Sequence, residues 1–204
     1  MRAACFWIGA ILSLGLARPA TAQIVTIPPG AYRTAAAWHR RQPSPAGVDA
    51  FYPDKRGLVV VVVPLGNTRT KVRFAPDSLW GYVSSKGRTR RLYRGGEYQL
   101  EAADTLAVYT SSMPGNIGTS GPATLTPGST AIGPYGGTRY FFSRGLTGLI
   151  FPLTPRYLRE AYGTSNPAFI ERLNSMRFDQ SLVDLDRKTG LFRVNTLYRA
   201  AAGH

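Results

Sequence analysis

The sequence of 204 residues predicts an α+β protein, an antiparallel β meander or small barrel followed by a helical C-terminal segment. Three observations predict this class. An unbroken aliphatic run at Leu58–Val63 is rich in valine, which favours strands over helices. Short apolar segments then follow at intervals of about eight residues, a spacing typical of a meander or barrel. After residue 154, apolar residues recur instead at helical spacing.

Residues 1–22 have the features of a secretory signal peptide. Arg2 supplies the positive start, Ala3–Leu16 the apolar region, and Ala20-Thr21-Ala22 the cleavage site. The apolar region is shorter than the roughly 20 residues that cross a bilayer, although an uncleaved N-terminal anchor is the alternative. We therefore expect an exported chain, periplasmic or extracellular, that starts at Gln23 and has no transmembrane span. Cys5 would leave with the signal, so neither disulfides nor lipid attachment is expected.

Residues 23–57 are expected to hold a strand, a short helix and a loop. Pro28-Pro29-Gly30 would close a strand at 23–27. Thr34 is a suitable N-cap for a helix over 34–41, because its hydroxyl can accept a bond from the first turn. Residues 42–57 are rich in proline and glycine and indicate a loop.

Residues 58–110 are expected to form the antiparallel β module. The aliphatic run lacks alternation, which predicts a strand covered on both faces. Gly66-Asn67 is a hairpin signal. Trp80 and Tyr82 would share a face, with Trp80 buried at the centre of the module. The further strands are expected at 71–74, 79–83, 89–93, 98–101 and 105–110.

Residues 111–137 differ in character from the segments on either side. They hold seven glycines and four prolines and no charged residue, which indicates a flexible loop. In residues 138–204 we expect strands at 139–143 and 149–151 and then helices that pack on the β module. Thr154-Pro155 and Asn166-Pro167 each combine an N-cap with a proline in the first turn, and a last helix is expected over 191–201.

The residues available for catalysis are few. The exported chain would have no cysteine, and His39 stands beside two arginines that would repel a metal ion. The other histidine is the last residue, His204. No nucleotide-binding motif and no nucleophile elbow occurs, so we expect no cofactor, no metal site and no serine-hydrolase triad.

The charge balance favours anionic partners. The formal net charge of +14 falls by two, to +12, when Arg2 and Arg18 leave with the signal. Such a chain is attracted to polyanions, and export favours anionic envelope polysaccharide or acidic lipid over nucleic acid. The alternative is that the cations only solubilise the surface. Strand alternation would place Arg88, Arg90 and Arg94 on one face and Arg91 on the other. The candidate ligand-binding residues are the densest cationic cluster, Lys86, Arg88, Arg90, Arg91 and Arg94.

These observations predict a non-enzymatic binding protein of the cell envelope, and two alternatives stay open. One is a hydrolase of envelope polysaccharide that uses a carboxylate pair, with Glu97 and Glu101 on one strand face or Asp184 and Asp186 as candidates. The other is a module whose mobile segment folds on a protein partner. Aromatic residues interleave with the basic cluster, and core packing is favoured over ligand stacking for all of them: Trp80, Tyr82, Tyr93 and Tyr98.

Part of the β module resembles a group of exported bacterial proteins of unknown function. The resemblance rests on Asp77-Ser-Leu-Trp-Gly-Tyr82, on Arg91-Leu-Tyr-Arg94 with Gly96-Glu-Tyr98, and on Leu106-Ala-Val-Tyr109. It covers roughly residues 55–110, with a weaker match in the tail helices, and the glycine-rich segment at 111–137 departs from the pattern. The resemblance implies export and a β module, and no catalytic activity.

Overall fold

The computed structural model of the chain describes residues 26–52, 54–111 and 138–203. Their strands and helices follow in the order β1 (Gly30–Tyr32), α1 (Ala35–His39), β2 (Asp49–Phe51), β3 (Val59–Leu65), β4 (Thr68–Phe74), β5 (Gly81–Val83), β6 (Thr89–Tyr93), β7 (Gly96–Ala102), β8 (Leu106–Ser111), β9 (Arg139–Arg144), β10 (Phe151–Pro152), α2 (Pro155–Tyr162), α3 (Pro167–Asn174) and α4 (Arg193–Ala201). A short 3₁₀ turn over Pro76–Ser78 precedes β5.

The strands form two antiparallel sheets, which confirms the α+β class. The larger sheet has the order β1-β5-β6-β7-β8-β9-β10, and the smaller has the order β2-β3-β4. The larger sheet stays open, because β1 and β10 lie at its two edges and do not pair with each other. The meander expectation therefore holds for β5–β9, and the barrel alternative does not.

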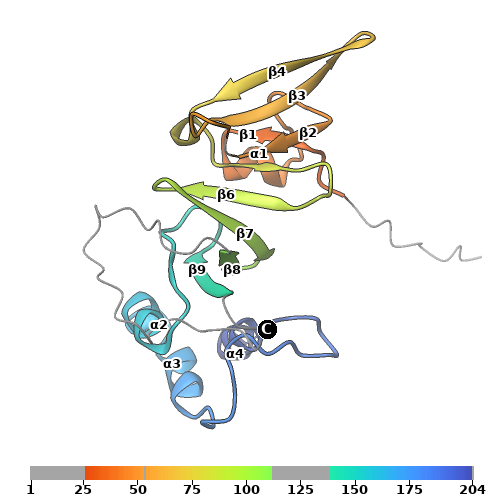
Figure 1. Cartoon of the computed structure of the whole chain (residues 1–204). Helices are drawn as coiled ribbons and strands as arrows, with labels where there is room; N and C mark the ends of the chain where they lie inside the picture. The colour runs from red at the N-terminus through yellow and green to blue at the C-terminus, as the bar shows by residue number, and fades with distance from the viewer. Residues whose placement is uncertain (1–25, 53, 112–137, 204) are drawn as a thin grey trace, which may run out of the picture.

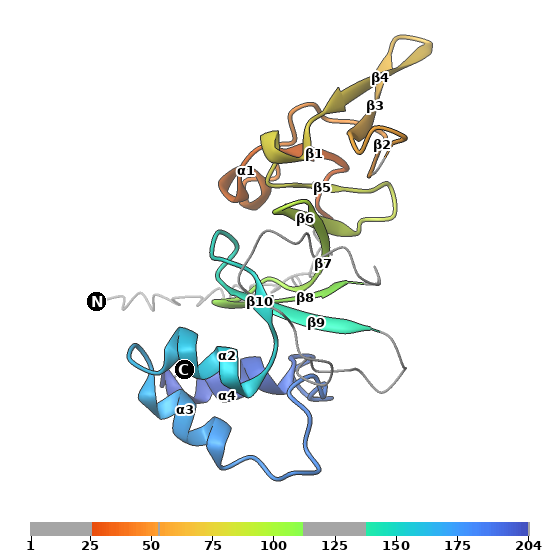
Figure 2. The ribbon, with the colours of Figure 1, turned by 60° about the vertical axis from the view of Figure 1, so that its left-hand side comes forward.

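The two faces of the larger sheet carry different cores. Neighbouring residues of β8 show the division, because Ala107 packs with α1 whereas Val108 packs with the C-terminal helices. The face with Val108 is covered twice, by α2–α4 over β8 and β9 and by the smaller sheet over β1, β5 and β6. Figures 1 and 2 show the β3–β4 hairpin at one end of the molecule and helices α2, α3 and α4 at the other.

The local helix signals are confirmed. The side chains of Thr34, Thr154 and Asn166 each accept a hydrogen bond from the backbone N–H three residues later, as N-caps do. Pro155 and Pro167 stand in the first turns of α2 and α3, where a missing N–H costs nothing. Within the described ranges, none of the helices is long and apolar enough to cross a membrane.

The N-terminal segment differs from the expectation. Residues 1–25, and with them the expected signal peptide and most of the expected strand at 23–27, lie outside the described residues. Ile27 is not part of a strand, and β1 begins at Gly30 instead. The expected loop at 42–57 contains β2, which pairs with β3 through Ala50 and Val61. Pairing with the apolar strand β3, the next strand along the chain, outweighs the turn-like composition of this segment.

The β3–β4 hairpin explains a second difference. Gly66 adopts a φ of 57° in the two-residue turn, as the sequence predicted. Only Val59–Val61 of the aliphatic run are buried, however, because Leu58, Val62 and Val63 are half-buried. Leu65, beyond the run near the hairpin tip, is 65% exposed. The hairpin runs past the end of the larger sheet, so none of the other described segments covers its tip (Figure 1).

Trp80 is not at the centre of the β module. It is half-buried and packs with Trp38 and Leu146 on one face, whereas Tyr82 lies in the core on the other face. The chain bends at Trp80 before β5 begins, which breaks the alternation that would have put both rings on one side. Gly81 allows the start of β5 to lie close against β6, because a Cβ at this position would collide with the carbonyl of Arg90.

Ser111, expected as the first residue of the glycine-rich loop, is the last residue of β8 and pairs with Arg139. The remainder of that expected loop, residues 112–137, lies outside the described residues. The ends of β8 and β9 are thus direct neighbours in the sheet.

Candidate functional site

The predicted basic cluster is divided among three environments. Lys86 and Arg88 lie in the turn between β5 and β6, and both are exposed. Arg94 is exposed in the turn between β6 and β7, at the opposite end of β6. At about 3.4 Å per residue, Arg88 and Arg94 are roughly 20 Å apart along the strand. The structure therefore does not bring these five cations together.

Arg91 lies inside the protein and is 4% exposed. Its guanidinium donates to the Tyr109 hydroxyl at 3.0 Å, to Ser143 Oγ at 3.1 Å and to the Gly148 carbonyl at 2.6 Å. It also stands over the ring of Tyr93, 5.4 Å from the ring centroid. Strand alternation correctly predicted that Arg91 and Arg90 lie on opposite faces of the sheet. The face that carries Arg91, however, is covered by other parts of the protein. Arg91 holds the β9–β10 loop against β6 and is unavailable to an external ligand.

Arg90 is engaged as well. Its guanidinium lies 2.9 Å from the carboxylate of Glu97, and the two side chains are 23% and 10% exposed. Burial raises the pKa of Glu97, and the positive charge of Arg90 opposes that rise. One carboxylate oxygen, Oε2, is buried without a hydrogen-bond partner. Arg90 and Glu97 are thus a half-buried ion pair on the sheet.

The exposed cations of β4 form a basic row that we did not predict. Arg69, Lys71 and Arg73 alternate along the strand and therefore lie on one face of the hairpin. All three are exposed, and Arg73 pairs with Asp54 at 3.4 Å. The density of cations along the chain does not reveal this row; the signal for it in the sequence is a cation at every second residue of a strand.

The β5–β6 turn approaches the same face of the smaller sheet. Asp49 and Lys71 both pair with Val62 of β3, from opposite sides, so their side chains share a face at about 10 Å separation. The backbone N–H of Ser85 donates to Asp49 Oδ1 at 3.0 Å, which places the turn beside that face. We call the exposed cations of this region the hairpin basic surface, made of Arg69, Lys71, Arg73, Lys86 and Arg88.

The first candidate carboxylate pair does not form an open acid–base site. Glu97 and Glu101 stand four residues apart on β7, about 14 Å along the strand, whereas glycosidase carboxylates are roughly 5–9.5 Å apart. Gln99 lies between them on the strand, and Arg90 pairs with Gln99 across the sheet. Glu101 accepts hydrogen bonds from Gln99 and Thr110. The positions between the carboxylates are thus occupied by protein side chains.

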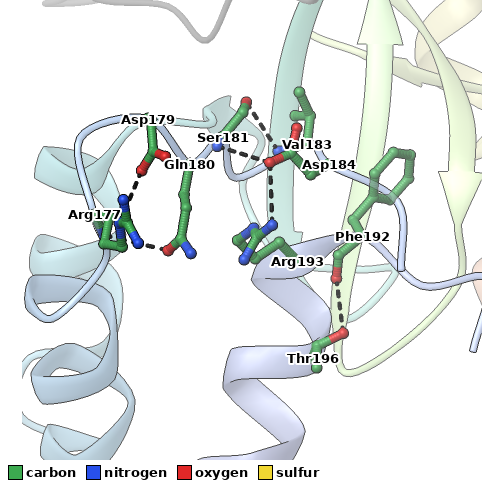
Figure 3. A network of polar contacts seen from close by, with 9 residues as sticks. All are labelled: Arg177, Asp179, Gln180, Ser181, Val183, Asp184, Phe192, Arg193 and Thr196. Carbon is green, nitrogen blue, oxygen red and sulfur yellow. Dashed lines mark hydrogen bonds and ion pairs between the residues drawn. The ribbon is translucent and has the colours of Figure 1, made fainter. Parts of the chain in front are cut away.

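The second candidate pair has structural roles. Asp184 accepts hydrogen bonds from the Ser181 N–H at 2.9 Å and from Arg193 at 3.2 Å, which ties the α3–α4 loop to the start of α4 (Figure 3). Asp186 accepts from the backbone N–H groups of Lys188 and Thr189, as in a turn. Across 26–52, 54–111 and 138–203, no three residues among His, Cys, Asp and Glu are grouped so that they could hold a metal ion.

The aromatic residues near the basic cluster are packing elements. Tyr82 is buried, and Tyr98 packs edge-on against Phe141 at a centroid distance of 5.0 Å. Trp80 donates its indole N–H to the Leu146 carbonyl at 2.8 Å. These contacts agree with the interpretation of Trp80, Tyr82 and Tyr98 as packing residues. Tyr93 is half-buried and lies against the guanidinium groups of Arg91 and Arg94.

Comparison of the chain with known protein families, with curated proteins and with solved structures finds no match. The resemblance of residues 55–110 to exported bacterial proteins therefore stays a prediction.

Proposed function

We propose that the protein is a non-enzymatic, exported envelope protein that binds the phosphate or carboxylate groups of anionic polysaccharide or acidic lipid. The observation that carries the proposal is the hairpin basic surface, five exposed cations on β4 and on the β5–β6 turn, which the Ser85–Asp49 hydrogen bond places beside the face that carries the basic row. It replaces the β6 cluster as the candidate site, because Arg91 and Arg90 are engaged within the protein and Arg94 is remote.

The local charge supports this proposal. Two carboxylates at this surface are already engaged, because Asp49 accepts a hydrogen bond from the Ser85 N–H and Asp54 pairs with Arg73. Lys86, Arg88, Arg69 and Lys71 form no ion pair with a carboxylate of the described residues. Cations without internal partners can exchange water for an external anion, and arginine can bind phosphate or carboxylate through two parallel hydrogen bonds.

Export is the second component of the proposal and rests on the sequence of residues 1–22. N-terminal sequencing of the protein from the envelope fraction tests it. We expect the mature chain to start at Gln23, and a retained Met1 would contradict the proposed export.

The binding test compares two variants that lose the same charge. Lys86→Gln with Arg88→Gln removes two cations from the hairpin basic surface, and Arg187→Gln with Lys188→Gln removes two exposed cations from the α3–α4 loop. Retention on immobilised alginate, and on vesicles with and without phosphatidylglycerol, is measured against salt concentration. Because exposed charges are screened over about 8 Å at physiological salt, retention should fall as salt rises.

We expect the first variant to elute at lower salt than the second, on alginate, on phosphatidylglycerol vesicles or on both. The two arms distinguish a polysaccharide from a lipid source of the anion. Equal behaviour of the two variants on both supports would overturn the proposal, because net charge alone would then explain retention.

A further inference from the structure

Strand β4 is an open sheet edge. Within residues 26–52, 54–111 and 138–203 it is the outer strand of the smaller sheet, with the order β2-β3-β4, and pairs with β3 on one side only. Figures 1 and 2 show the β3–β4 hairpin projecting beyond the rest of the fold, so the edge is accessible from outside. An open edge presents backbone N–H and C=O groups to which another extended chain can bind.

The register identifies which backbone groups face outward. The carbonyl of Val62 accepts a hydrogen bond from the N–H of Val48, so the backbone of Val62 faces β2. Val62 and Lys71 are therefore a non-hydrogen-bonded pair, and the N–H and C=O of Lys71 point to the open edge. By the same alternation, the backbone groups of Arg69 and Arg73 point outward too.

The residues that offer free backbone groups are thus the same residues that carry the basic row. An antiparallel strand added at this edge would place one residue directly opposite each of Arg69, Lys71 and Arg73, with its side chain on the same face. Opposite charges at such positions stabilise a strand pair, and like charges destabilise it. Every second residue of the incoming strand should therefore be acidic.

We propose that the β4 edge binds an extended acidic segment of a partner protein by antiparallel strand addition, with Asp or Glu at alternate positions. This goes beyond the proposed function, because it requires paired backbones and a fixed order of charges. A second copy of this chain is a poor occupant, since β4 against β4 would bring cations together. Residues 112–137 carry no charged residue and cannot supply the carboxylates.

The first test uses synthetic peptides with the full exported chain. One peptide has Glu at alternate positions separated by Thr and Val, and its control has the same composition with the glutamates in one block. We expect the alternating peptide to bind at least about tenfold more tightly in fluorescence anisotropy. N-methylation of its Glu residues should abolish binding, and N-methylation of the intervening residues should not, because only the Glu N–H groups face β4.

The second test uses the protein edge. Lys71→Pro removes an N–H that faces outward and leaves the bonds to β3 in place, whereas Lys71→Gln removes the charge alone. We expect the proline variant to bind the alternating peptide more weakly than the glutamine variant, while circular dichroism shows both folded. If the proline variant is unfolded, the N-methylated peptides decide the question on the wild-type chain.

Equal affinity for the alternating and block peptides, or equal effects of the two N-methylation patterns, would overturn the inference. The cations of β4 would then serve only to keep the edge from aggregating. The alginate and vesicle tests of Lys86 and Arg88 are independent of peptide order. A negative result in the peptide tests therefore does not contradict the proposed polyanion binding. A negative result on alginate and vesicles likewise does not contradict strand addition.

Discussion

The guanidinium of Arg91 donates a hydrogen bond to the hydroxyl of Tyr109 at 3.0 Å, across the interior of the larger sheet. The same hydroxyl lies 3.0 Å from Ser143 Oγ, so side chains of β6, β8 and β9 meet at one polar cluster. No carboxylate of the described residues pairs with Arg91. The terminal nitrogens of Arg91 donate to neutral acceptors, and the guanidinium lies over the rings of Tyr93 and Tyr109, while Nε is buried without a hydrogen-bond partner.

We predict that Arg91→Lys lowers the free energy of unfolding by about 2–3 kcal/mol, more than Arg91→Met, which should cost about 1–2 kcal/mol. Lysine keeps a buried charge but cannot reach both Tyr109 and the Gly148 carbonyl, whereas methionine removes the charge. Urea unfolding measures both variants, with exposed Arg88→Met as the control, expected within about 0.5 kcal/mol of wild type. A lysine variant as stable as wild type would contradict the assigned role of the cluster.

Trp80 should contribute less to stability than its size implies. Trp80→Phe loses the indole bond to the Leu146 carbonyl and should cost about 1 kcal/mol. Because the ring is half-buried, Trp80→Ala should cost less than Phe142→Ala, for which removal of a fully buried ring predicts about 3–5 kcal/mol. Chemical denaturation of the three variants provides the comparison. A larger loss for Trp80→Ala than for Phe142→Ala would show that Trp80 is central to the core after all.

Glu97 should make stability fall as pH rises. Its pKa in the folded chain is raised from the ordinary value of 4.5, chiefly by burial, so the folded state binds more protons than the unfolded state between the two values. Stability relative to Glu97→Gln should therefore decrease from about pH 4.5 up to the folded pKa, and then level off. Urea unfolding of both proteins across this range measures the difference, and a carboxyl that titrates below 4.5 by NMR would refute the sign.

The junction of β8 and β9 should accept a short turn. Ser111 and Arg139 are paired neighbours, so a two-residue Asn-Gly turn can join them in place of residues 112–138. Loop closure changes by only about 0.6 kcal/mol per doubling of loop length, so we expect unfolding free energy within about 2 kcal/mol of wild type, on the stabilising side. Calorimetry of the shortened chain measures this. A loss of several kcal/mol would mean that the replaced residues contribute to the folded core.

Local features of the fold could be predicted because each depends on a few adjacent residues. Thr34, Thr154 and Asn166 cap their helices, and Gly66-Asn67 turns the hairpin, through contacts within four positions of the chain. The candidate site was only partly predictable. Lys86 and Arg88 were candidates from the sequence alone. Arg69, Lys71 and Arg73 were recognised only from the structure, where β4 is an exposed edge strand.

The sequence by itself determined the α+β class, the strands from β6 to β9 and the starts of α1, α2 and α3, because periodicity and capping act within one element. The last helix was expected over 191–201 and begins at Arg193 without a side-chain cap. Only the tertiary structure decided that β2 pairs with β3, that Trp80 and Tyr82 face different cores, and that Arg91 is buried. The first depends on which strand lies beside β2 in the sheet, and the other two depend on which strand or loop covers a given face. The sequence around Arg91 would be the same whether its guanidinium contacted water or the Gly148 carbonyl. Its burial therefore depends on how the β9–β10 loop packs against β6.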